Sequence, residues 1–316
     1  ASTRILIMDI FRESITMTAT GQNRELYNQD FLDANCNPDA VPFNEQNGVD
    51  SSVATFSTNY IVSAIAIFFA LHMRKMFYQS PPQQQDDHND DKEHVEVAVS
   101  VYFICTGLSF GIAGLGHQFS KEQEEVLNQY LLRIVAFFGN VANFALLRVM
   151  ILYRQPLSES SKLLWTWRIV FVTALVWGTV VAVNNVFFVA VPGLIAVLSG
   201  LVLHAWQWKR SRTLALGMKT CGFVCYLMGG VAQIILAPVC GYDAYPDCFV
   251  DCPLPAPNFN HNALFHVFAI FYFLLYGMGE WLQPAQKCLA LLRQQERASA
   301  DRIRDGDVSL PELDGS

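Results

Sequence analysis

The sequence has little charge, and its longest apolar stretches have almost none. Only 16% of its 316 residues are Asp, Glu, Lys or Arg, whereas 52% are hydrophobic. No basic stripe interleaved with aromatic residues lies outside the apolar stretches, so nothing in the sequence supports nucleic-acid binding. The formal net charge of −7 comes mainly from the two ends of the chain and from positions 86–96. Such acidic segments are typical of solvated chain and do not indicate a basic partner.

Seven apolar stretches are each long enough to cross a bilayer, which takes about 20 residues of helix. They are Ala54–Met73, Val97–Gly116, Val126–Tyr153, Leu163–Val183, Val186–Trp208, Leu214–Val239 and Asn262–Leu282. The fourth and fifth share the uncharged run Ile169–Trp208, which is too long for one crossing and is predicted to divide at Asn184 and Asn185. The sequence therefore predicts an all-α polytopic integral membrane protein with a seven-transmembrane-helix bundle at residues 54–283.

Lysine and arginine predict the orientation, because they are retained on the cytoplasmic side during insertion. With the N-terminus outside, 16 of the 21 basic residues fall on inner loops or inner span ends. Five of the six tryptophans also fall at inner span ends, where indole prefers the headgroup boundary. We therefore expect the N-terminus outside and the C-terminus in the cytoplasm of a plasma-membrane or secretory-pathway protein.

Two segments flank the predicted bundle. Residues 1–53 are expected to form an extracellular or lumenal cap, and residues 284–316 a cytoplasmic amphipathic helix and tail. Apolar and basic residues alternate over Ala285–Arg304 after Pro284. This pattern predicts a helix that lies on the inner leaflet or against a partner.

Four of the eight cysteines fall outside in this topology: Cys36, Cys240, Cys248 and Cys252. An oxidising compartment favours disulfide bonds between them. We expect Cys36 to pair with Cys240, Cys248 or Cys252, which would tie the N-terminal segment to the sixth loop. Metal binding is disfavoured because the CxxxC spacing has no second pair.

Polar residues inside the predicted spans need partners or a function. Asn140, Asn143, Lys219 and Gln233 are predicted to hydrogen-bond neighbouring helices. Three histidines, His117, His261 and His266, are expected at one level near the outer surface. Imidazole is a common metal ligand, so they are candidate metal ligands; hydrogen bonding within the bundle is the alternative.

Three short motifs resemble the CREST superfamily of seven-helix membrane proteins, which includes alkaline ceramidases and the progestin and adiponectin receptors. Asn59–Ser63 resembles the start of the first span in alkaline ceramidases. Gly114–His117 resembles the Ser-x-x-x-His segment that ends the second span. Asn262–Val267 resembles the His-x-x-x-His that opens the last span.

The resemblance implies a zinc ion held by three histidines, aided by a serine and an aspartate, with zinc-bound water attacking an amide. His117 and His266 match two histidine ligands. Ala113 stands in the serine position, Asn128 in the aspartate position and Asn262 in that of the remaining histidine. His261 is one residue away from that position and could serve if the helix begins after it.

Two functions therefore remain open, and the sequence does not decide whether the protein is an enzyme. The first is a non-catalytic receptor-like, lipid-binding or accessory subunit, with membrane lipids and other membrane-protein subunits as partners and no cofactor. The second is a zinc-dependent membrane lipid amide hydrolase of the alkaline ceramidase type. A G-protein-coupled receptor is disfavoured because the third span ends in Leu152-Tyr153-Arg154 and the last lacks Asn-Pro-x-x-Tyr. The absence of lysine from the last span disfavours a retinal protein, and the absence of repeat halves disfavours a transporter.

Overall fold

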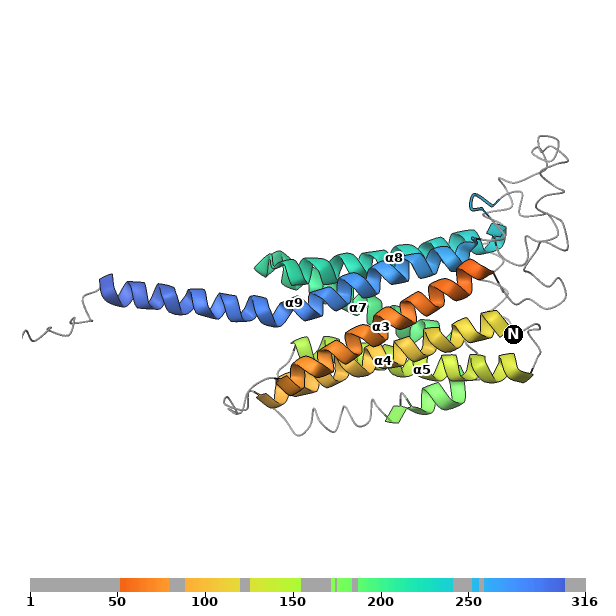
Figure 1. Ribbon diagram of the computed structural model, residues 1–316, viewed down its shortest axis with the longest axis horizontal. Helices are drawn as coiled ribbons and strands as arrows, with labels where there is room; N and C mark the ends of the chain where they lie inside the picture. Colours follow the sequence, from red (N-terminus) through yellow and green to blue (C-terminus); the bar gives the residue numbers. More distant parts are fainter. Residues whose placement is uncertain are drawn as a thin grey trace, which may run out of the picture.

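The computed structural model describes residues 52–79, 89–119, 126–154, 172–173, 175–183, 187–240, 252–255 and 259–304. Over these ranges the chain is all-helical (Figure 1). The elements are α3 (Val53–Gln79), α4 (Asn89–Phe119), α5 (Val126–Arg154), η3 (Trp177–Ala182), α7 (Phe187–Ser211), α8 (Leu214–Cys240) and α9 (His261–Arg304). A helix satisfies its backbone polar groups internally, which is what an apolar surrounding requires.

Six of these helices are long and apolar enough to cross a membrane. They contain five of the seven predicted spans and overlap a sixth, Val186–Trp208, and one, Val126–Tyr153, has the predicted bounds. The predicted fourth span lies mostly outside the described residues; its described part includes η3, a short π-helix in which Val183 N donates to Gly178 O at 3.2 Å. The division at Asn184 and Asn185 also lies outside them. The count of seven crossings stays a prediction.

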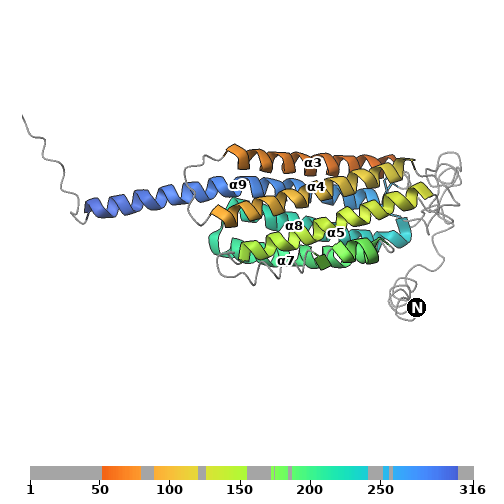
Figure 2. The same ribbon diagram turned by 90° about the horizontal axis from the view of Figure 1, so that it is seen from below.

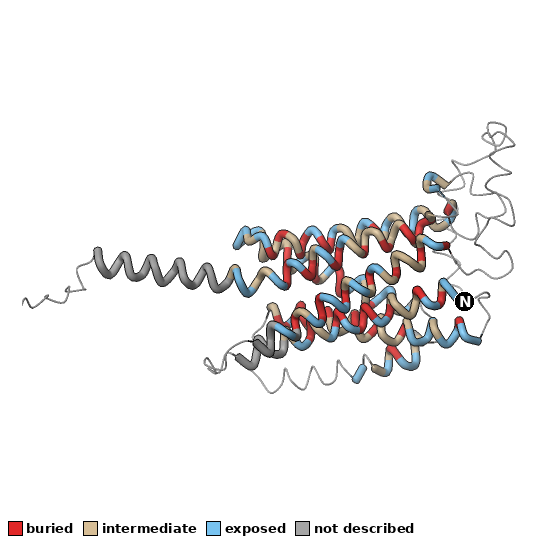
Figure 3. The backbone as a smooth tube through the Cα atoms, viewed as in Figure 1, coloured by how far each residue is buried: buried red, intermediate tan, exposed pale blue. Residues whose placement is uncertain are grey.

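The helices form a bundle in which each packs against the next in the order α3, α4, α5, α7, α8 and α9, and α9 closes against α3 (Figures 1 and 2). η3 lies against α5 and α7. The buried residues lie where helices face one another, and many exposed residues are large and apolar (Figure 3). Such an outer surface suits lipid, which, unlike water, does not penalise exposed Leu, Ile, Val and Phe.

Aromatic side chains fill the centre of the bundle. The largest buried ones are Tyr102, Phe103, Phe223, Tyr272, Phe273 and Tyr276. The Tyr102 hydroxyl donates to the Tyr272 hydroxyl at 2.8 Å. This hydrogen bond pairs two buried polar groups. Ring pairs such as Tyr272 and Phe273, with centroids 4.8 Å apart, pack edge to face. The core is therefore a close-packed cluster of aromatic rings.

Three of the four residues predicted to hydrogen-bond a neighbouring helix do so: Asn143, Gln233 and Lys219, the last described with the functional site. Asn143 of α5 donates to the carbonyl of Val189 in α7 at 3.1 Å, and Gln233 of α8 donates to the side chain of Asn262 in α9. Asn140 instead donates to Ala136 O, one turn earlier in its own helix.

α9 is the longest of the described helices and extends past its predicted span. It runs through Pro284 to Arg304 as one helix, and Figures 1 and 2 show the extension continuing beyond the bundle roughly in line with the span. Proline removes one helical hydrogen bond and can bend a helix without ending it. The placement of this extension on a membrane surface or against a partner stays a prediction.

The turn between α7 and α8 contains a left-handed residue, Arg212, with φ of 53°. Its backbone N–H donates to Trp208 O at 2.8 Å, which closes the end of α7. Glycine is the usual residue at such a position, because a side chain there costs about 1–2 kcal/mol.

Candidate functional site

The least expected feature of the bundle is a buried ion pair between α8 and α9. Lys219 Nζ lies 2.8 Å from Glu280 Oε2, and the two side chains are 0% and 5% exposed. Charged side chains within membrane spans are costly and are therefore a functional-site candidate by default. Here each charge is neutralised by the other.

A hydrogen-bond network extends this pair to a third helix. Lys219 donates to the hydroxyl of Tyr153 in α5 at 3.2 Å and to the side-chain oxygen of Gln283 in α9. Tyr153 in turn donates to Glu280 Oε2. The three N–H groups of the ammonium thus have three acceptors, and Nζ also lies 4.6 Å from the centroid of the Tyr153 ring. We call Tyr153, Lys219, Glu280 and Gln283 the charge network.

Close packing of α8 against α9 makes the network possible. A Cβ at Gly279 would lie 2.6 Å from Lys219 Cγ and 2.8 Å from the carbonyl oxygen of Ala215. Only glycine leaves space there for the stem of Lys219 to pass across α9. The absence of one side chain thus sets the distance between the two charged helices.

His204 of α7 borders the network. It is fully buried, and its ring packs against the rings of Tyr153, Phe223 and Tyr276, whose centroids are 5.6, 5.7 and 6.2 Å away. The Gln207 side chain approaches the ring, but neither ring nitrogen has a well-formed hydrogen bond to a described residue. The same holds for the Tyr276 hydroxyl, which approaches Glu280, and for Glu280 Oε1.

These atoms form one group of buried polar positions beside a satisfied ion pair. Most buried polar atoms in proteins are paired, so such a group calls for an explanation.

Sequence reasoning assigned Lys219 a packing role and did not single out Tyr153, His204 or Glu280. The usable signal was one basic residue in the sixth predicted span and one acidic residue in the seventh, both near the inner ends. Opposite charges in two spans of one bundle predict a pair. Which face of each helix they occupy could not be read from the sequence.

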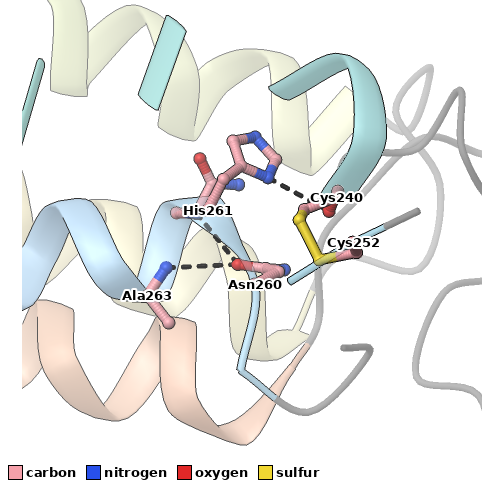
Figure 4. Close-up of a disulfide and its surroundings, with 6 residues drawn as sticks. Cys240, Cys252, Asn260, His261 and Ala263 are labelled. Atoms are coloured by element: carbon pink, nitrogen blue, oxygen red, sulfur yellow. Dashed lines mark hydrogen bonds between the residues drawn. A yellow bond between two sulfur atoms is a disulfide. The ribbon is translucent and has the colours of Figure 1, made fainter. Parts of the chain in front are cut away.

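Two of the predicted outer histidines, His266 and His261, are held by different contacts. His266 Nδ1 lies 3.1 Å from the hydroxyl of Thr58 in α3, and its ring packs on Phe110 of α4. His261 Nδ1 lies 3.2 Å from the carbonyl oxygen of Cys240, at the end of α8 (Figure 4). His117 is half-buried near the end of α4.

α9 begins at His261, so His261 and His266 lie on the same helix five residues apart and point about 140° away from each other. The condition under which His261 could replace the missing ligand, a helix that begins after it, is therefore not met. Within the described ranges, no three His, Cys, Asp or Glu side chains are grouped as ligands of one metal ion. The donor set does not fit the zinc site that the CREST resemblance implies.

The neutral residues of the predicted site also have contacts within the bundle. Asn262 accepts a hydrogen bond from Gln233. Asn128 is buried, with its side-chain oxygen 3.8 Å from where a Cβ on Gly116 would be. Ala113 is half-buried on α4. These positions have no ionisable group, and the observed contacts are those of helix packing.

A disulfide and a helix cap fix the start of α9 (Figure 4). Cys240 is bonded to Cys252, with a Cα–Cα distance of 5.0 Å. Asn260 accepts hydrogen bonds from the backbone N–H groups of Asn262 and Ala263 at 3.0 and 3.1 Å, as an N-cap does. Thr55 of α3 donates to the same oxygen at 3.3 Å.

This disulfide narrows the predicted pairing of Cys36. Cys240 ends α8 and Cys252 lies 12 residues further along the chain, within the connection to α9. Because they bond to each other, neither is the partner of Cys36. Of the three predicted partners only Cys248 remains, and Cys36 and Cys248 lie outside the described residues.

We predict that non-reducing peptide mapping recovers Cys240 linked to Cys252 and Cys36 linked to Cys248. The expected reason is that all four cysteines lie on one side of the membrane in the predicted orientation. The Cys105 thiol, buried among the spans, provides the control and should stay reduced. Recovery of Cys36 linked to Cys240 or Cys252 would contradict both pairings.

The fold and the two polar sites define an all-α membrane protein with histidines at one end of its bundle and a buried charge network toward the other. A model of the family of unknown function DUF6962 matches residues 54–280, and the chain belongs to this family. The matched range contains both members of the ion pair and every predicted metal ligand, but neither Cys36 nor the extension of α9. Comparison with curated proteins and with solved structures found no match.

Proposed function

We propose that this chain is a non-catalytic, receptor-like membrane protein with seven crossings, its N-terminus outside and its C-terminus in the cytoplasm. It works through the arrangement of its helices, alone or as a subunit of a membrane complex. The CREST-like motifs are, on this proposal, a divergent form of that fold in which the hydrolytic site is lost.

The charge network is the observation that carries the proposal. A buried ion pair is seldom the most stable choice, since two apolar residues of similar volume are often as stable or more so. The presence of the ion pair is better explained if it holds α5, α8 and α9 in one specific arrangement. The neighbouring polar atoms of His204, Tyr276 and Glu280 supply partners for a second arrangement, and two alternative arrangements are what a receptor needs.

The outer histidines support the non-catalytic side of the proposal. Catalytic zinc needs about three protein ligands that converge on one point and an open position for water. His266 turns toward α3 and α4, whereas His261 turns toward the end of α8. Neutral asparagines, Asn128 and Asn262, occupy two of the positions that hold a carboxylate or a histidine ligand in the CREST superfamily.

We predict that the purified protein holds less than one zinc ion per chain and does not hydrolyse amide-linked lipids such as ceramides. Metal content by mass spectrometry and product release measured with and without added zinc are the tests. His117→Ala and His266→Ala should lower stability by about 1–3 kcal/mol through orphaned buried partners. Neither variant should change a metal content that is already low.

The alternative, a zinc-dependent lipid amide hydrolase, gives the opposite pattern. Stoichiometric zinc that survives purification and disappears in both histidine variants together with hydrolysis would replace our proposal with that enzyme. His72, a histidine outside the predicted site whose ring packs on Trp281, provides the matched control. His72→Ala should leave metal content and hydrolysis unchanged in either case.

A further inference from the structure

The turn between α7 and α8 places a group of cations at one end of the bundle. The candidate membrane spans Phe188–Ser211 and Leu214–Cys240 meet there, so the turn lies at the membrane surface. Lys209, Arg210 and Arg212 are all exposed. The sequence has no Asp or Glu between Glu159 and Asp243, so no acidic residue close in the chain neutralises them.

Two of the three cations are positioned by tryptophan. The guanidinium carbon of Arg210 lies 3.8 Å from the centroid of the Trp206 ring, and that of Arg212 lies 5.9 Å from the Trp208 ring. A Cβ at Gly217 would come within 3.1 Å of Trp208 Nε1, so this glycine lets the indole pack against α8. A guanidinium stacked on a ring face keeps its in-plane N–H groups available for a phosphate oxygen.

The backbone at Arg212 indicates that this side chain has a use. A turn that only had to end α7 would favour glycine at a φ of 53°, because glycine avoids the steric cost. Arginine at this position has the steric cost and adds a positive charge. A strained position of this kind is a reason to look for function.

We propose that the α7–α8 turn binds the phosphate of an anionic phospholipid headgroup through Arg210 and Arg212, with Lys209 adding charge. A lipid fits better than a soluble phosphate compound for two reasons. The turn lies where headgroups lie, and Trp206, which is half exposed beside Arg210, is the residue type that prefers the headgroup boundary. The proposal does not depend on whether the protein is a receptor or an enzyme.

The test uses the full chain, purified in a neutral detergent, with equal amounts of phosphatidylserine and phosphatidylcholine added. Native mass spectrometry then counts the lipids that stay bound. We expect phosphatidylserine to be retained preferentially. Arg210→Gln and Arg212→Gly should each lower its affinity about fivefold, which corresponds to about 1 kcal/mol per basic residue, and the double variant about 25-fold.

Two controls separate binding from folding. Arg212→Gly removes the backbone strain, so its melting temperature should equal or exceed that of the wild type while its binding falls. Arg133→Gln removes an exposed arginine of α5 that lies 5.9 Å over the Tyr130 ring, and it should leave phosphatidylserine binding unchanged.

Three results would overturn the proposal. The first is equal retention of the two lipids by the wild type. The second is undiminished phosphatidylserine binding by the Arg210→Gln, Arg212→Gly double variant. The third is loss of bound phosphatidylserine on addition of inorganic phosphate at the same concentration, which would assign the turn to a free phosphate ion.

Discussion

Glu280→Leu is expected to destabilise the protein by about 3–5 kcal/mol, because it leaves the Lys219 ammonium buried without its counter-charge. Lys219→Met should have a similar effect, since it orphans the Glu280 carboxylate. The double variant, Lys219→Met with Glu280→Leu, should recover most of the loss, because two apolar side chains need no partner in that position. Reversible unfolding in mixed micelles measures all three.

The same variants test whether the charge network holds one arrangement of helices. Hydrogen exchange should become faster in the inner parts of α8 and α9 in each single variant and less so in the double variant. Lys209→Met, which removes an exposed charge ten residues earlier in the chain, should change neither stability nor exchange appreciably. Additive losses in the double variant would show that the two side chains act independently and would remove the main support for the receptor-like proposal.

Gly279→Ala is expected to lower stability by about 1–3 kcal/mol although it adds only one methyl group. The new Cβ would lie 2.8 Å from the Ala215 carbonyl oxygen, which belongs to the backbone of α8 and can move only with the helix. α8 must therefore shift away from α9, and the Lys219 stem, 2.6 Å from the same point, must shift with it.

Gly230→Ala in α8 is the matched control, because nothing lies within 4 Å of its Cβ position. This replacement should be neutral or stabilise the helix by about 0.5–1 kcal/mol, since alanine has the higher helix propensity. Thermal unfolding of the two variants side by side provides the comparison. Equal stability would show that α8 and α9 do not approach as closely as described.

The candidate sites were less predictable than the spans, and α9 shows why. The apolar stretch Asn262–Leu282 indicated the start of the last span to within one residue, and His266 is buried near that start. His261 is one residue away from the expected ligand position, Asn262. Successive residues along a helix are rotated by about 100°, so this offset changes the direction in which the side chain points. His261 consequently meets the end of α8 instead of the neighbours of His266.

The disulfide illustrates a related limit. The topology correctly grouped Cys240 and Cys252 on one side, and the sequence left three partners open for Cys36. The choice depends on how the segment after α8 returns to the start of α9, where Asn260 caps the helix and Cys252 comes within reach of Cys240. That path is a property of the packed chain.

The sequence by itself determined the all-α membrane character of this protein and the positions of the six apolar helices that the structure describes. The length and apolar character of a span are local properties, and lipid requires each span to satisfy its own backbone. Tertiary structure alone decided which polar residues meet. Lys219 and Glu280 are 61 residues apart in the chain, and their pairing depends on the rotation of α8 and α9 and on the close approach at Gly279.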